Sequence, residues 1–147
     1  MRVRWANFPV PEAYLVGIAL GWILDYFFRL KLFEFDQVGI SLGVTAVLIG
    51  LGLCLWSVAA AGRMEIAAPD ALLTGGPYAY SRNPMYLGWG LLHLGTAFLL
   101  NTAWLLGTLV LAFGYLHFVE IPKEESKMEA KFGEEYRQYR QQVRRYL

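Results

Sequence analysis

Two long stretches of the chain carry no charged side chain, and polar segments flank them. Residues 39–62 and 83–119 contain no Asp, Glu, Lys or Arg. A membrane-spanning helix needs about 20 mostly apolar residues, within a range of about 17–25. The pattern predicts four spans, at about 13–30, 38–61, 84–100 and 102–119, followed by a polar tail over 120–147. We therefore expect an all-α fold, a polytopic transmembrane helical bundle of about four spans with a C-terminal cytoplasmic helical tail.

Several residues indicate where these helices begin and turn. Pro11 and Glu12 suit the first turn of a helix, because proline lacks an N–H that would be unpaired there. Asn83 followed by Pro84 predicts an N-cap and the first helical position. Only Asn101 and its neighbours separate the last two spans, and so short a connection predicts an antiparallel helical hairpin. The two outer ends of that hairpin should lie on the same side of the membrane.

The tail shows a second helical pattern. Residues 120–131 should continue the fourth span as helix, with Gly133 as a C-cap. Beyond it, residues at helical spacing form an apolar stripe flanked by arginines: Tyr136, Tyr139, Val143 and Tyr146, beside Arg137, Arg140, Arg144 and Arg145. This predicts an amphipathic helix that lies on a membrane or across the cytoplasmic face of the protein itself.

Composition and charge placement agree with a membrane protein. The 147 residues are 56% hydrophobic, whereas a soluble domain averages about 45–50%. The net charge is only +1, but residues 120–147 hold seven of the thirteen Lys and Arg residues. In a four-span topology these seven share a side with Arg2, Arg4, Arg63 and Arg82, while Arg29 and Lys31 lie on the other side. The positive-inside rule then predicts that both termini are cytoplasmic.

A few polar or reactive residues interrupt the apolar stretches. Asp25 either pairs with Arg29 four residues later or has a function in the membrane. His93, near the middle of the third span, is either a functional residue or a hydrogen-bonded packing residue. Cys54 is the single cysteine, so it excludes an intramolecular disulfide and a zinc motif, and it should be a small buried apolar side chain. We expect no metal site.

The hairpin should bring two polar clusters together. Arg82 precedes its first helix, and Glu124 follows its second. A guanidinium grips a carboxylate with its planar fork, and carboxylates accept hydrogen bonds from ammonium groups and ribose hydroxyls. Glu124 and Glu125 should point about 100° apart on a helix, so one would face a ligand while the other braces a loop or faces water. The alternative is that these charges are solvated and that Arg82 only anchors the interface.

Three elements in this order resemble a known family. The stretch G-P-Y-x-Y-x-R-N-P-M-Y-L-G runs from Gly76 to Gly88, an adjacent glutamate pair follows at 124–125, and F-G-x-x-Y-x-x-Y occupies 132–139. Together they resemble the isoprenylcysteine carboxyl methyltransferase family, and the related phospholipid N-methyltransferases are similar. The resemblance covers about residues 73–147, whereas the first half of the chain matches only as generic spans.

The resemblance implies an integral membrane enzyme that binds S-adenosylmethionine at the cytoplasmic face and releases S-adenosylhomocysteine. It implies cofactor contacts from Arg82, Asn83, Pro84, Tyr86, Gly88, Glu124 and Glu125. We add Tyr78, His117 and Glu120 as cofactor-binding candidates and expect Arg82 and Glu124 to be catalytic. Eukaryotic members usually have histidine where this chain has Asn83, and asparagine cannot accept a proton at neutral pH. That difference argues against a base at this position.

The expected reaction is methyl transfer to a lipophilic or membrane-embedded acceptor, either an isoprenylcysteine-like carboxylate or a phospholipid-like amine. A carboxylate needs no base, whereas an amine must lose a proton, which Glu120, Glu124 or His117 could accept. The expected partners are the bilayer and a lipid or other lipophilic substrate, with no nucleic acid. An NADPH-dependent enzyme like the membrane sterol reductases and a non-enzymatic membrane adaptor are the alternatives. Alternating strand and helix units are absent from the pattern, which excludes a Rossmann-type methyltransferase.

Overall fold

The computed structural model describes residues 11–34, 36–62, 64 and 69–147, and within them every regular element is a helix. The elements in chain order are α1 (Glu12–Phe27), α2 (Asp36–Ala61), the 3-10 turn η2 (Gly76–Ala79), α3 (Pro84–Leu99), α4 (Ala103–Tyr115), the π-helical turn η3 (Leu116–Glu120), α5 (Ile121–Phe132) and α6 (Glu134–Gln142). The predicted all-α fold class is therefore confirmed.

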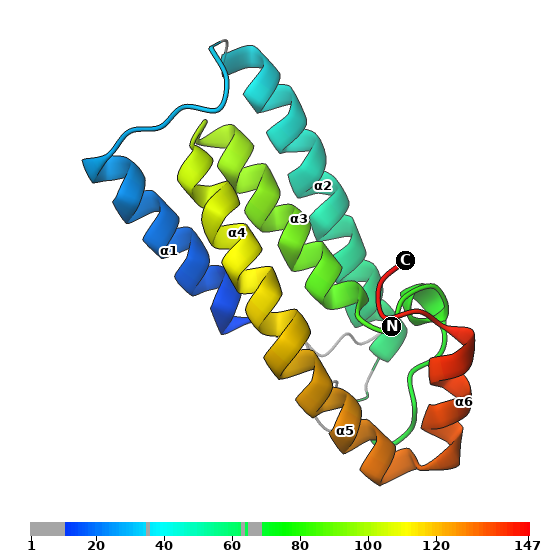
Figure 1. Cartoon of the computed structure of the whole chain (residues 1–147). Helices are drawn as coiled ribbons and strands as arrows, with labels where there is room; N and C mark the ends of the chain where they lie inside the picture. Colours follow the sequence, from blue (N-terminus) through cyan, green and yellow to red (C-terminus); the bar gives the residue numbers. More distant parts are fainter. Residues whose placement is uncertain (1–10, 35, 63, 65–68) are drawn as a thin grey trace.

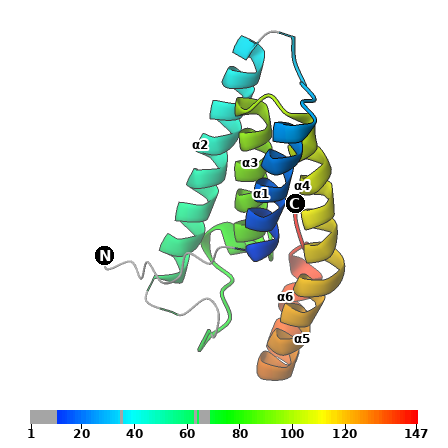
Figure 2. The same ribbon diagram turned by 90° about the vertical axis from the view of Figure 1, so that its left-hand side faces the viewer.

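Four helices run side by side to form the body of the molecule, and α5 and α6 extend beyond one end (Figure 1, Figure 2). α2 packs along α3, α1 packs along α4, and α3 lies against α4. Glycines let α2 and α3 approach closely. A Cβ added to Gly50 would lie 2.8 Å from the carbonyl oxygen of Gly88, and one added to Gly95 would lie 2.9 Å from that of Gly43. Small residues at such contacts suit helix packing in lipid.

The first three helices begin and end within about three residues of the predicted limits, and the fourth begins within one residue of its predicted start. α1 ends at Phe27 instead of residue 30. Just after this end, the Phe28 carbonyl oxygen accepts a hydrogen bond from the Trp104 indole instead of continuing the helix. Among the described helices, α2 and the continuous helix Ala103–Phe132 are long and apolar enough to cross a membrane. α1 and α3 have 16 residues each. Three of the arginines that were counted in predicting the orientation lie outside the described residues: Arg2, Arg4 and Arg63.

The fourth helix continues into the tail as predicted. α4, η3 and α5 form one helix of 30 residues. It ends at Gly133, whose φ of 55° lies in the left-handed region that glycine adopts without strain. The predicted second tail helix is too long, however. α6 ends at Gln142, and Val143 has extended backbone angles. Val143 and Tyr146 therefore lie outside the helix, because the chain end pairs instead with the turn before α3, as described below.

The end of the bundle away from α5 is closed by Asn101. Its φ of 50° places it in the left-handed region, where asparagine is one of the few tolerated residues. Its Oδ1 accepts hydrogen bonds from the backbone N–H groups of Leu32 and Phe33 at 3.0 and 2.8 Å. Its Nδ2 donates to the Phe33 carbonyl oxygen at 2.9 Å and to Asp36 Oδ1 at 2.8 Å. The α3–α4 turn is thereby fastened to the α1–α2 connection.

Three polar or reactive side chains that the sequence singled out lie within the bundle. Asp25 is buried and lies 3.6 Å from the Arg29 guanidinium, as the pairing alternative predicted. His93 is fully buried, with Nε2 3.3 Å from the Thr108 hydroxyl and its ring edge-on to Tyr14. These contacts agree with the packing alternative for His93, although its Nδ1 is buried without a hydrogen-bond partner among the described residues. Cys54 is fully buried in an apolar cluster, as expected.

Candidate functional site

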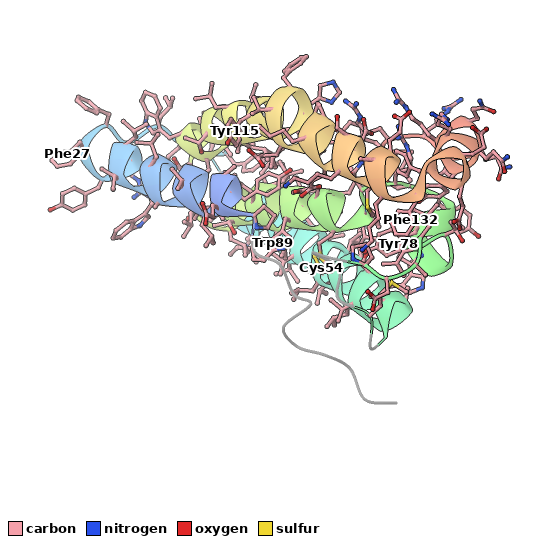
Figure 3. The ribbon with its side chains drawn as sticks, turned by 90° about the horizontal axis from the view of Figure 1, so that it is seen from below. Phe27, Cys54, Tyr78, Trp89, Tyr115 and Phe132 are labelled. Carbon is pink, nitrogen blue, oxygen red and sulfur yellow. The ribbon has the colours of Figure 1, made fainter. Side chains whose placement is uncertain are left out.

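A cavity of about 450 Å³ opens at the end of the bundle where α3 begins and α4 passes into α5. We call it the groove. Figure 3 shows Tyr78 and Phe132 at this end and Phe27 at the opposite one. One part of its lining is apolar and includes Leu72, Leu73, Met85 and Met128. The other part holds titratable and hydrogen-bonding groups: Tyr78, Arg82, Asn83, Tyr86, Glu124, Glu125, Lys127, Tyr136 and Tyr139. A ligand with both polar and apolar portions suits such a lining.

The hairpin brings Arg82 and the glutamate pair together, as predicted, but Arg82 pairs with Glu125. Its Nη1 lies 2.9 Å from Glu125 Oε1, and both side chains are about nine-tenths buried. Arg145, near the end of the chain, binds the same carboxylate through Nη2 at 2.6 Å and Nε at 3.1 Å. One buried carboxylate thus joins two guanidinium groups. Such charge-assisted hydrogen bonds are stronger than neutral ones and fix the orientation of the groups.

Glu124 faces a different set of neighbours. Its Oε1 accepts a hydrogen bond of 2.7 Å from the Tyr86 hydroxyl. Glu124 follows the uncharged stretch 83–119 in the sequence. Burial raises the pKa of its carboxyl, and the hydrogen bond from Tyr86 offsets part of this rise. The backbone carbonyl of Tyr86 accepts a hydrogen bond from the Tyr14 hydroxyl, which ties this turn of α3 to α1. The two glutamates therefore have separate surroundings, as their helical spacing predicted.

Three tyrosines complete the polar side of the groove. The Tyr139 hydroxyl donates to the carbonyl oxygen of Tyr78 at 2.6 Å, and the Tyr136 hydroxyl accepts from Arg82 Nη1 at 3.3 Å. Both are buried, so α6 lies across the protein rather than apart from it. Burial raises the pKa of Tyr78 to about 12, so its hydroxyl keeps its proton at neutral pH.

Two buried polar atoms of the groove residues lack a hydrogen-bond partner among the described residues. They are the Tyr78 hydroxyl and Arg82 Nε. A buried donor without a partner costs about 1–3 kcal/mol, and a charged one costs more. Both atoms can donate to an acceptor such as a carboxylate or a hydroxyl. The groove therefore offers two unused donors beside the Glu124 carboxylate, which can accept.

The remaining predicted site residues divide into two groups. Asn83 and Pro84 line the groove. The side chain of Asn83 does not cap α3, because its Nδ2 donates to the carbonyl oxygen of Arg145 at 3.1 Å. Three others are outside the lining: Gly88 packs against α2, Glu120 binds Tyr115 and Lys123, and His117 Nδ1 lies 2.8 Å from the Tyr146 hydroxyl.

Four residues that were not predicted as site residues line the groove or bind residues that line it. Tyr136, Tyr139 and Arg145 contact predicted residues directly, and the Ser81 hydroxyl donates to the Arg145 carbonyl oxygen at 3.2 Å. The two tyrosines had a signal in the stripe of the tail. Arg145 was among the arginines that flank this stripe, but the sequence did not predict its contact with Glu125, because that contact depends on where α6 ends and how the chain folds back.

Comparison with known proteins assigns the family. The family model of phospholipid methyltransferase matches residues 38–135, more than half of the chain. A relative described as protein-S-isoprenylcysteine O-methyltransferase, from Tribolium castaneum, is 26% identical over 140 residues, which cover 88% of this chain and 50% of the relative. An uncharacterized protein of Haemophilus influenzae is 42% identical over 64 residues, 43% of this chain and 100% of that protein. The chain thus spans about half the length of the Tribolium protein. Because the family model covers more than half of the chain, the chain belongs to the phospholipid methyltransferase family.

Proposed function

We propose that this protein is an S-adenosylmethionine-dependent methyltransferase whose acceptor is a lipophilic molecule of the bilayer. The observation that carries the proposal is the pair of buried, unused donors, the Tyr78 hydroxyl and Arg82 Nε, which border one groove with Glu124. Membership in a methyltransferase family supports this chemistry over reduction by NADPH and over an adaptor function. The residues that line the groove also suit the polar groups of the cofactor.

The cofactor carries a carboxylate, an ammonium group and ribose hydroxyls, and it supplies a methyl group activated by attachment to a sulfonium. Arg82 and Tyr78 would donate to its acidic or hydroxyl oxygens, and Glu124 would accept from its donors. Asn83, Pro84 and Tyr86 would shape the wall, and Glu125 would hold Arg82 in place. Gly88 and His117 would support the site from outside through the contacts of α3 and Tyr146, and Glu120 would add negative charge nearby.

We assign catalysis chiefly to alignment, with Arg82 and Glu124 as the residues that hold the reacting groups in place. Correct placement of two reactants contributes up to about 7–11 kcal/mol in favourable cases. An amine acceptor must also lose a proton. Glu124 is the best placed of the three candidate acceptors, since it lines the groove and its raised pKa brings it closer to neutral pH. A carboxylate acceptor would need no such step.

We further propose that α1, α2, α3 and α4 all cross the membrane, with both termini cytoplasmic. α1 and α3, at 16 residues, would span about 24 Å at about 1.5 Å per residue, near the lower limit for a bilayer. Many large apolar side chains on the bundle are exposed, including Trp22, Leu48, Ile49, Val110 and Leu111. Lipid would cover them. Labelling of single cysteines placed at the exposed residues 31 and 135, in a protein whose native Cys54 is replaced by alanine, tests this topology, because only residue 135 should react from the cytoplasm.

Calorimetric titration of the detergent-solubilised protein with S-adenosylhomocysteine tests the function. We expect saturable binding, and we expect Tyr78→Phe to weaken it by about tenfold through loss of one donor. Tyr80→Phe is the matched control, because Tyr80 is two residues away and exposed. A folded wild-type protein that binds no S-adenosylhomocysteine would overturn the proposal. Transfer of labelled methyl groups to a lipid extract would then identify the acceptor class.

A further inference from the structure

The last five residues of the chain form a strap across the turn that precedes α3. After α6 ends at Gln142, the chain runs back towards this turn (Figure 1). The backbone N–H of Arg82 donates to the carbonyl oxygen of Arg144 at 3.0 Å. The carbonyl oxygen of Arg145 accepts from Ser81 Oγ and from Asn83 Nδ2. Residues 143–147, which we call the strap, thus hold three successive residues of the turn.

The side chain of Arg145 reaches past this pairing to Glu125. It binds both carboxylate oxygens, while Arg82 shares one of them. The bidentate grip of Arg145 fixes the plane of the carboxylate, and the carboxylate in turn fixes Arg82 Nη1. Glu125 and Tyr136 hold Nη1 of Arg82, so the whole guanidinium keeps one orientation. Its Nε, which has no partner among the described residues, is thereby held in one orientation as well.

We propose that Arg145 is a positioning residue for the cofactor site. It acts through Glu125 to hold Arg82 in the orientation in which its unused donor can meet the cofactor. The inference rests on the proposed function, since it assigns a residue to that same site. It adds a contribution from the end of the chain, from a residue that does not line the groove.

The strap has attachments that do not depend on the Arg145 guanidinium. The backbone hydrogen bonds to the turn use carbonyl oxygens, and Tyr146 stacks on His117 and lies 2.8 Å from its Nδ1. Truncation of the Arg145 side chain should therefore leave the strap in place while it frees the Glu125 carboxylate. This separates a positioning effect from a loss of structure.

The experiment compares Arg145→Met, Arg145→Lys and Arg144→Ala in the full-length protein. Arg144 is the matched control, because its side chain is exposed and the turn uses only its backbone carbonyl. We expect Arg145→Met to raise the dissociation constant of S-adenosylhomocysteine by about tenfold or more. Arg145→Lys should recover part of this loss, since an ammonium binds one carboxylate oxygen, and Arg144→Ala should change it less than twofold.

A second measurement, hydrogen exchange of the Arg82 amide in the ligand-free protein, reports on the strap itself. Protection of this amide should persist in Arg145→Met if the effect is one of positioning. Binding equal to wild type in Arg145→Met overturns the inference and leaves the proposed function intact. Loss of Arg82 protection in Arg145→Met also overturns it, because the residue would then hold the fold. If the wild-type protein binds no S-adenosylhomocysteine, the proposed function fails first and the inference falls with it.

Discussion

At the end of the bundle where α3 turns into α4, polar groups are satisfied by one another. Asn101 is buried and uses both side-chain atoms in four hydrogen bonds to the α1–α2 connection. At the other end, Arg82 and Tyr78 are just as deeply placed, yet each has a donor with no partner among the described residues. Both ends contain buried polar side chains, but within the described residues only the groove end leaves hydrogen-bond donors of its lining residues unused.

This contrast separates structure from function. A buried polar network that is fully satisfied can rigidify a fold, whereas a buried donor without a partner costs free energy. The cost at the groove is compensated if a ligand supplies the acceptor. On the proposed function, the Asn101 end is therefore the fixed frame and the groove end is the site that binds the cofactor. Four substitutions test this division, and they follow in order of expected effect.

Asn101→Ala should have the largest effect, and it should be on stability. It removes four hydrogen bonds and places alanine at a φ of 50°, so we expect a loss of about 3 kcal/mol in the free energy of unfolding. Glycine tolerates the same φ, so Asn101→Gly separates the free energy lost with the hydrogen bonds from the free energy lost through backbone strain. The affinity of the folded protein for S-adenosylhomocysteine should not change. A parallel loss of affinity would show that the two ends are coupled.

Gly88→Ala tests whether this residue belongs to the frame or to the groove. An added Cβ would lie 2.5 Å from Cys54 Sγ and 3.0 Å from the Gly50 carbonyl oxygen, so α2 and α3 must separate. Overpacking of this kind costs about 1–3 kcal/mol, which thermal unfolding in detergent can measure. Gly52→Ala is the control, because its added Cβ would meet nothing within 4 Å. A stable Gly88→Ala protein with weakened cofactor binding would return Gly88 to the cofactor contacts.

Glu124→Gln should affect the groove alone. The amide keeps the shape of the side chain but removes its charge, so we expect S-adenosylhomocysteine to bind about tenfold more weakly, which corresponds to about 1.4 kcal/mol. Glu129→Gln is the control on the same helix, because Glu129 pairs with Arg137 and Arg140 outside the groove. Thermal stability should change little in either variant. Unchanged binding by Glu124→Gln would place the cofactor elsewhere.

Tyr86→Phe should give the smallest effect, a shift in pH dependence. The Tyr86 hydroxyl donates to Glu124 and thereby lowers the pKa of a carboxyl that burial has raised. Its removal should raise that pKa further. If ionised Glu124 binds the cofactor, binding in the variant will fail at a higher pH than in the wild type as the solution is acidified. Tyr115→Phe, which removes a similar bond to Glu120 outside the groove, should leave the pH profile unchanged.

The amino-acid sequence alone was sufficient to predict the four helices of the bundle and the approach of the Arg82 turn to the glutamate pair. Uncharged stretches at 39–62 and 83–119 predicted apolar helices, and the short connection at Asn101 predicted the hairpin. The hairpin in turn brought the Arg82 turn to the glutamate pair, because an antiparallel pair of helices returns the chain to its starting side. Local hydrophobicity and turn residues carry such information directly.

Tertiary structure decided which groups meet within that region. The sequence predicted that Arg82 lies near the two glutamates but not which of them it binds; the fold pairs Arg82 with Glu125 and turns Glu124 to Tyr86. It also ended α6 at Gln142 and carried Arg145 back to the same carboxylate. The physical reason is competition between partners. A helical pattern continues through Tyr146, but the carbonyl oxygens of Arg144 and Arg145 bind the turn at 81–83. That contact exists only once α6 has packed against the turn before α3.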